Sequence, residues 1–176
     1  VGYVSANKLD KLDISINIDG SGSMIGYVSV NNNNYTEALD AIENVVDKNQ
    51  TTTVEYKRIG DDKLISRNDF RRDAKSKFFY DGSNPQQYQK VSSPIQEAIQ
   101  PPSQGKDKLT IIVTDLEGDD GDLISERLKQ YYFNPQVKEQ GYTVGVWAIK
   151  TQFQGNVYDP NTGRTKFYYS TEGKTK

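Results

Sequence analysis

Segments with a strand pattern alternate along this chain with segments of helical periodicity, and this alternation constrains the fold more than any other feature. Residues 12–18 place an apolar side chain at every second position, which is typical of a strand. Residues 109–113 are a nearly continuous β-branched run, which predicts a strand buried on both faces. Residues 144–149 predict a third strand. Residues 52–59 are a weaker candidate, and residues 77–80 a candidate edge strand.

Helical patterns with start signals lie between these strands. The first predicted helix begins at Asn34. The second has Ser93 as its N-cap and Pro94 at its first helical position. The third begins at Asp122 and ends near residues 134–135 (Asn-Pro), since a residue before proline disfavours the helical conformation. The apolar residues expected to share the buried face of the first helix are Ala38, Leu39, Ile42, Val45 and Val46.

This order of elements predicts an α/β fold with a doubly wound, mostly parallel sheet and helices on both faces. Residues 152–169 differ, because a turn at 159–163 separates two arms with aromatic residues; they predict a C-terminal β-hairpin. A chain of 176 residues has the size of one domain. We therefore expect a single domain over residues 1–176, with its core in 11–150 and the hairpin extension in 151–176.

The amino-acid composition excludes several kinds of catalytic and metal-binding site. The chain contains no Cys and no His, so disulfides, thiolate nucleophiles and Ser-His-Asp catalysis are excluded, and any metal must be bound by oxygen atoms. Oxygen ligands favour Mg²⁺, Mn²⁺ or Ca²⁺. The 22 basic and 24 acidic residues are well mixed, so we expect no nucleic-acid partner. No apolar run approaches the roughly 18–20 residues of a membrane-spanning helix, so we expect no membrane insertion.

Polar residues gather where two predicted strands end. Strand 12–18 leads into Asp19 and the Gly-Ser-Gly-Ser run at 20–23, and strand 109–113 leads through a threonine into Asp115. In an open α/β sheet, ligands bind beyond the carboxyl ends of the strands. Two carboxylates and several hydroxyls suit a hard divalent cation. The candidate metal ligands are Asp19, Ser21, Ser23, Ser93 and Asp115.

The Asp-Gly-Ser-Gly-Ser run at 19–23, after an apolar strand, resembles the Asp-x-Ser-x-Ser signature of the von Willebrand factor A (VWA) family. That signature begins the metal-ion-dependent adhesion site (MIDAS) of the family. Ser93 resembles a second-loop position that is usually Thr, and residues 114–115 (Thr-Asp) resemble the third-loop pair. The resemblance covers residues 11–150. It implies a Rossmann-like VWA fold, Mg²⁺ held by the five candidate ligands, and protein–protein binding rather than catalysis.

Two features depart from the family pattern. Leu116 follows the third-loop aspartate, where the family often has Gly, and the family usually continues with a further strand and a closing helix. We expect the chain either to be truncated before those two elements or to have diverged there. The sequence does not determine the compartment; N-glycosylation-type tripeptides at 34–36 and 49–51 and the start at Val1 lean toward an exported protein.

The sequence thus predicts a metal-dependent interaction or adhesion module without enzymatic activity. An Asp or Glu carboxylate of a protein partner would complete the coordination of the bound cation. One alternative is a structural or assembly subunit that has a structural metal and self-associates through its hairpin and sheet edge. The other is a Mg²⁺-dependent phosphoryl-transfer enzyme, although Ser21 stands where a haloacid-dehalogenase-like phosphatase has a second Asp. Residues 19–23 also suit a plain turn and helix cap.

Overall fold

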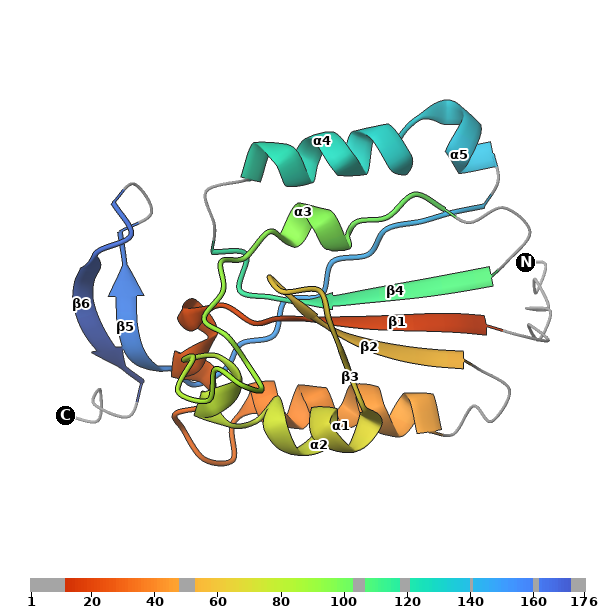
Figure 1. Cartoon of the computed structure of the whole chain (residues 1–176). Helices are drawn as coiled ribbons and strands as arrows, with labels where there is room; N and C mark the ends of the chain where they lie inside the picture. Colours follow the sequence, from red (N-terminus) through yellow and green to blue (C-terminus); the bar gives the residue numbers. More distant parts are fainter. Residues whose placement is uncertain are drawn as a thin grey trace.

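A four-stranded mixed sheet with helices on both sides, and a separate two-stranded hairpin, make up the protein (Figure 1). The structure is a computed structural model and describes residues 12–47, 53–102, 107–117, 121–139, 141–159 and 162–171. The strands are β1 (Leu12–Asp19), β2 (Thr53–Ile59), β3 (Lys63–Ile65), β4 (Asp107–Val113), β5 (Gln154–Tyr158) and β6 (Thr165–Ser170). The helices are α1 (Asn34–Asp47), α2 (Arg67–Asp73), α3 (Ile95–Ala98), α4 (Gly121–Tyr131), α5 (Pro135–Glu139) and the 3-10 helices η1 (Gly22–Tyr27) and η2 (Lys77–Phe79).

The central strand of the larger sheet is β1. The strand order is β3-β2-β1-β4, and β1 is parallel to both β2 and β4, with Ile16 opposite Tyr56 on one side and Ile111 on the other. Among the described strands of this sheet, β3 alone runs antiparallel to its neighbour. The α/β class and the predicted strands at 12–18 and 109–113 are therefore confirmed, as is the weaker candidate strand from Thr53 onward; residue 52 lies outside the described residues. Because β1, β2 and β4 are parallel, their carboxyl ends lie at one end of the sheet.

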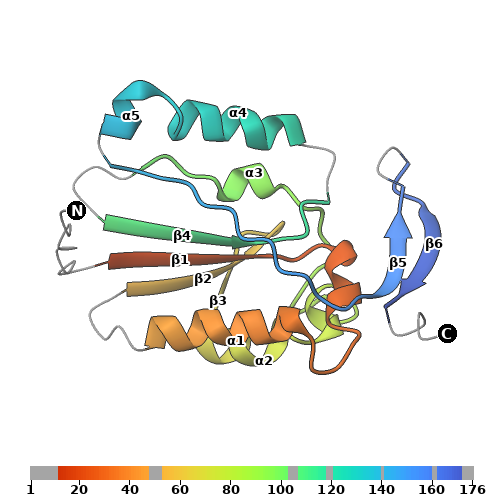
Figure 2. The same cartoon turned by 180° about the vertical axis from the view of Figure 1, so that it is seen from behind.

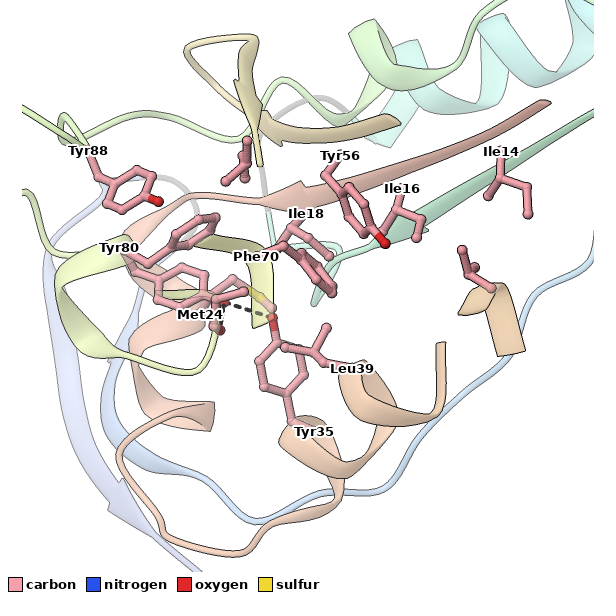
Figure 3. Packing of buried hydrophobic residues seen from close by; sticks show 14 residues of the cluster. Ile14, Ile16, Ile18, Met24, Tyr35, Leu39, Tyr56, Phe70, Tyr80 and Tyr88 are labelled. Carbon is pink, nitrogen blue, oxygen red and sulfur yellow. Dashed lines mark hydrogen bonds between the residues drawn. The ribbon is translucent and has the colours of Figure 1, made fainter. Parts of the chain in front are cut away.

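The two faces of β1 are packed differently. Ile14, Ile16 and Ile18 are buried against α1, α2 and η2, where Figure 3 shows Leu39 and Phe70 packing around them. On the opposite face Ser15 and Asn17 are buried, and the Asn17 amide donates to Ser15 Oγ at 3.1 Å. The apolar and polar alternation in the sequence thus corresponds to one hydrophobic and one polar face, both covered.

The helices lie in two layers (Figure 2). The first layer, α1 and α2, packs tightly on the sheet, whereas α4, α5 and the short α3 lie on the other side. No residue of α4 is buried, and Leu109 on β4 is 43 % exposed. The expectation that β4 is buried on both faces is therefore wrong, because β4 lies at the sheet edge beneath a loosely packed layer. No described helix is both long and apolar enough to cross a membrane.

Three features of the predicted helices need correction. α1 begins at Asn34, but its N-cap is Asn33, whose Oδ1 accepts the Thr36 N–H at 2.9 Å. Val45 is not on the buried face: its side chain is 64 % exposed. Ser93 does not cap α3, which begins two residues later without a side-chain cap, because the Ser93 hydroxyl is bonded elsewhere.

Two predicted strands are absent from the part of the chain that the structure describes. Residues 77–80 form η2 and its C-cap, and Phe79 and Tyr80 are fully buried. Residues 144–149 are extended but unpaired, with Trp147 91 % exposed. A strand needs a hydrogen-bonding partner. Here the chain instead runs from α5 to the start of α1, where the Asn34 amide donates to the Lys150 carbonyl at 2.7 Å.

The C-terminal hairpin is confirmed, with β5 and β6 antiparallel. It stands at the end of the sheet to which the carboxyl ends of β1, β2 and β4 point (Figures 1 and 2). Phe153 attaches it to η1, with its ring 5.0 Å from that of Tyr27 in an edge-to-face arrangement. A β-carbon added to Gly26 would lie 2.1 Å from the Phe153 ring, so η1 and the hairpin approach each other closely.

Two substitutions on α1 test which side chains form its buried face. We expect Leu39→Ala to lower the free energy of unfolding by about 2–5 kcal/mol, because it leaves a cavity between α1 and the sheet. Val45→Ala on the same helix should change it by less than about 0.5 kcal/mol. Urea unfolding followed by circular dichroism measures both. Equal losses would contradict the packing described above.

Candidate metal centre

The carboxylate of Asp19, at the end of β1, joins three loops. Its side chain is fully buried, and Oδ1 accepts the backbone N–H of Ser21 at 2.9 Å. Oδ2 accepts the hydroxyl of Ser93 at 2.6 Å and the hydroxyl of Thr114 at 2.8 Å. The parallel register explains the geometry: Ile18 lies opposite Val113, so residues 19 and 114 leave the sheet together.

The other predicted ligands continue the same network. The hydroxyls of Ser21 and Ser23 are 3.0 Å apart, and the Ser23 hydroxyl is hydrogen-bonded to the Asp115 carboxylate. Asp115 Oδ1 also accepts the Glu117 N–H at 3.0 Å. The structure therefore brings all five sequence-predicted site residues into one connected cluster, which we call the Asp19 cluster.

Negative charge is concentrated in this cluster. Burial raises the pKa of Asp115 to about 6; the Glu117 N–H opposes the shift, and the charge of Asp19 adds to it. Burial also raises the pKa of Glu117, against a hydrogen bond from the Tyr158 backbone. Burial, with the charges of Asp115 and Glu117, raises the pKa of Tyr27 to about 12. Within the described residues, no Lys or Arg forms an ion pair with Asp19 or Asp115.

The donor set of the cluster fits a hard divalent cation. It offers two carboxylates and four hydroxyls, all oxygen donors, of the kind that Mg²⁺ and Ca²⁺ prefer. The described residues contain no group of three or more His, Cys, Asp or Glu side chains placed to hold a metal. The Asp19 cluster differs from such a group because four of its six side chains are neutral hydroxyls and only two are carboxylates. A divalent cation that is bound by few carboxylates retains net positive charge, so it can bind a further acidic ligand.

Thr114 belongs to the cluster but was not among the predicted ligands. Its hydroxyl donates to Asp19 and also accepts the Leu116 N–H at 3.0 Å. The signal in the sequence was its position between the strand end and Asp115. Leu116 itself has a positive φ of 57°, in the region that favours glycine. The loop after β4 thus turns through a left-handed residue that is not glycine.

Arg58 supports the loop that follows Asp19, and sequence analysis missed it. Its fully buried guanidinium donates to the carbonyls of Gly20 at 3.1 Å, Gln89 at 2.7 Å and Phe79 at 3.0 Å. Asp61 is 2.6 Å from its Nη1. Burial lowers the pKa of Arg58, and Asp61 opposes that shift. The sequence feature that could have identified Arg58 is its position in β2, two residues after the buried Tyr56.

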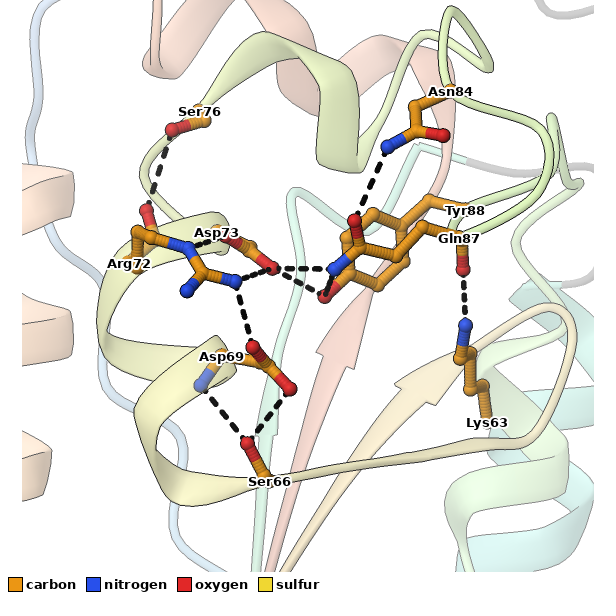
Figure 4. A network of polar contacts seen from close by, with 9 residues as sticks. All are labelled: Lys63, Ser66, Asp69, Arg72, Asp73, Ser76, Asn84, Gln87 and Tyr88. Carbon is orange, nitrogen blue, oxygen red and sulfur yellow. Dashed lines mark hydrogen bonds and ion pairs between the residues drawn. The ribbon is translucent and has the colours of Figure 1, made fainter.

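A second buried carboxylate, Asp73, holds the loop that leads to Ser93 (Figure 4). Asp73 Oδ2 accepts the Tyr88 hydroxyl at 2.7 Å and the Gln87 amide at 3.0 Å. Lys63 donates to the Gln87 carbonyl from the β2–β3 hairpin. These bonds attach the loop to α2 and to the sheet, so Ser93 is positioned by contacts well away from the cluster.

Two glycine substitutions test how closely Arg58 supports the cluster. A β-carbon at Gly20 would lie 2.6 Å from Arg58 Nε, whereas one at Gly22 would meet only Ile25 Cδ1, at 3.9 Å. We expect Gly20→Ala to lower the free energy of unfolding by about 1–3 kcal/mol through overpacking. Gly22→Ala should stay within about 0.5 kcal/mol of the wild type. Chemical unfolding gives both free energies. An unchanged free energy of unfolding in Gly20→Ala would show that Arg58 does not support this loop closely.

Comparisons of the chain with protein-family models, with curated proteins and with solved structures gave no match. They assign no family, and the arrangement of the Asp19 cluster itself is therefore the basis for any functional argument.

Proposed function

We propose that this protein is a metal-dependent protein-binding module with a doubly wound VWA-type fold and a MIDAS-like site. Its cation is Mg²⁺, with Mn²⁺ or Ca²⁺ as alternatives. The observation that carries the proposal is the convergence of hydroxyls from two other loops, Ser93 and Thr114, on one oxygen of Asp19. The position of β1 between two parallel neighbours, with helices on both faces, supports the fold assignment.

Each residue of the cluster has a distinct part in this proposal. Asp19 and Asp115 supply negative charge, and Ser21, Ser23 and Ser93 supply neutral oxygens at the same place. A bound divalent cation supplies a positive centre for an Asp or Glu side chain of a protein partner. Thr114 holds Asp19 in position.

The hydrogen bonding of Asp19 supports binding over catalysis. Both of its oxygens accept hydrogen bonds from the loops, Oδ1 from the Ser21 N–H and Oδ2 from two hydroxyls. These bonds fix the carboxylate, and Oδ1, with one hydrogen bond, retains a lone pair for a cation. A nucleophile or general base would instead need an oxygen directed at its substrate.

Cation titration tests the site. We expect chelator-stripped protein to bind Mg²⁺ or Mn²⁺ saturably in calorimetry, and Asp19→Asn to lose at least tenfold in affinity because it removes a charge from the cluster. The matched control is Glu126→Gln, an exposed carboxylate in the middle of α4, which should leave the affinity unchanged. Equal affinity in all three proteins would end the metal proposal.

Ser93 offers a second test that separates site residues from helix caps. Ser93→Ala should lower cation affinity severalfold, and its cost in stability of about 1–3 kcal/mol comes from the hydrogen bond that the buried Asp19 loses, since Ser93 caps no helix. Ser66→Ala should cost about 1 kcal/mol of stability and leave the cation affinity unchanged, because Ser66 Oγ accepts the Asp69 N–H at the start of α2. Calorimetry and thermal unfolding distinguish these outcomes. Cation binding without any affinity for acidic peptides would favour the structural-metal alternative.

A further inference from the structure

A cavity of about 280 Å³ lies between η1 and the hairpin. The hairpin side of the cavity is formed by one face: Gln154, Asn156 and Tyr158 alternate along β5, and Tyr168 on β6 lies opposite Asn156. The glycine-rich backbone of η1 forms the other side. The cavity thus lies between two regular elements, η1 and the hairpin, which are held together by the Phe153 contact with Gly26 and Tyr27.

The cavity has one charged side chain, Lys77, and no acidic one among its lining residues. In the part of the chain that the structure describes, the Lys77 ammonium has no ion pair or hydrogen bond, unlike those of Lys57, Lys63 and Lys75. The side-chain polar groups of Gln154, Asn156, Tyr158 and Tyr168 likewise have no partner among the described residues. An ammonium, two amides and two phenols that face one opening are donors suited to a carboxylate.

The cavity adjoins the Asp19 cluster directly. Gly22, which lines it, lies between Ser21 and Ser23 in the chain. From the hairpin side, the Tyr158 N–H is bonded to the Glu117 carboxylate, in the loop that follows Asp115. A short segment bound at the cluster therefore has a neighbouring place for another of its side chains.

We propose that the cavity binds a second carboxylate of the partner segment, with Lys77 as its counter-ion and the hairpin amides as hydrogen-bond donors. The proposal rests on the function proposed above and makes it more specific: the partner is an acidic segment with at least two Asp or Glu residues. Lys77 then sets specificity, because it is the one charged side chain that lines the cavity and no acidic side chain lines it beside Lys77.

The test uses synthetic peptides and the intact protein. The probes are glycine peptides, acetylated at the N-terminus and amidated at the C-terminus, with two Asp residues separated by one to four Gly, and matched peptides in which the second Asp is Asn. With Mg²⁺ at low ionic strength, we expect at least one two-acid peptide to bind about threefold to tenfold more tightly than its match. Lys77→Gln should abolish this difference, Lys77→Arg should keep it, and Lys129→Gln on α4 is the control for charge.

A metal-free arm separates this proposal from the previous one. With a chelator present, millimolar one-acid peptide should shift the NMR amide signals of Gly155 and Asn156 in the wild type but not in Lys77→Gln. If those shifts occur and Mg²⁺ has no effect, the metal site fails while the cavity remains a carboxylate site. If Mg²⁺ promotes one-acid binding and every two-acid peptide equals its match, the cavity proposal is overturned. Absence of shifts at residues 155–156 in both conditions overturns it as well.

Discussion

The buried carboxylate of Asp19 is the group on which the rest of this end of the molecule depends. Burying a carboxylate costs several kcal/mol unless hydrogen bonds replace its water. Here a backbone N–H and the hydroxyls of Ser93 and Thr114 replace that water, and each comes from a different part of the chain. The requirement to satisfy one charge therefore brings three loops into contact and creates the cluster of oxygens.

Arg58 explains why the loop after β1 can turn so tightly. Its guanidinium is fully buried, yet its N–H groups reach three carbonyls and the carboxylate of Asp61. The planar, forked shape of guanidinium makes such multiple bonding available to arginine and not to lysine. Phe79 and Tyr88 pack within 6 Å of its charge, so the cation is both hydrogen-bonded and enclosed by aromatic rings. The hydrogen bonds of Arg58 thus hold the loop after β1 in place.

The hairpin forms one side of the candidate site, where the four-stranded sheet does not reach. An isolated two-stranded hairpin has little stability of its own in water. This one is stabilised by Phe153, packed against Tyr27 and Gly26, and by the bond from Tyr158 to Glu117. The same contacts place its polar face beside the Asp19 cluster. Packing that stabilises the hairpin thus also creates the cavity that Lys77 lines.

Local patterns were sufficient to predict β1, β4, the hairpin and five of the six members of the Asp19 cluster, because strand periodicity and chain order place strand ends together. They were insufficient for residues 144–149, which have a strand composition but no bonding partner, and for η2, whose aromatic residues fill the core. They also misassigned Ser93, a good N-cap by sequence that bonds Asp19 instead. The sequence by itself determined which side chains alternate and where strands end. Only the tertiary structure decided which groups each strand, hydroxyl and buried charge contacts, because such contacts join residues far apart in the chain.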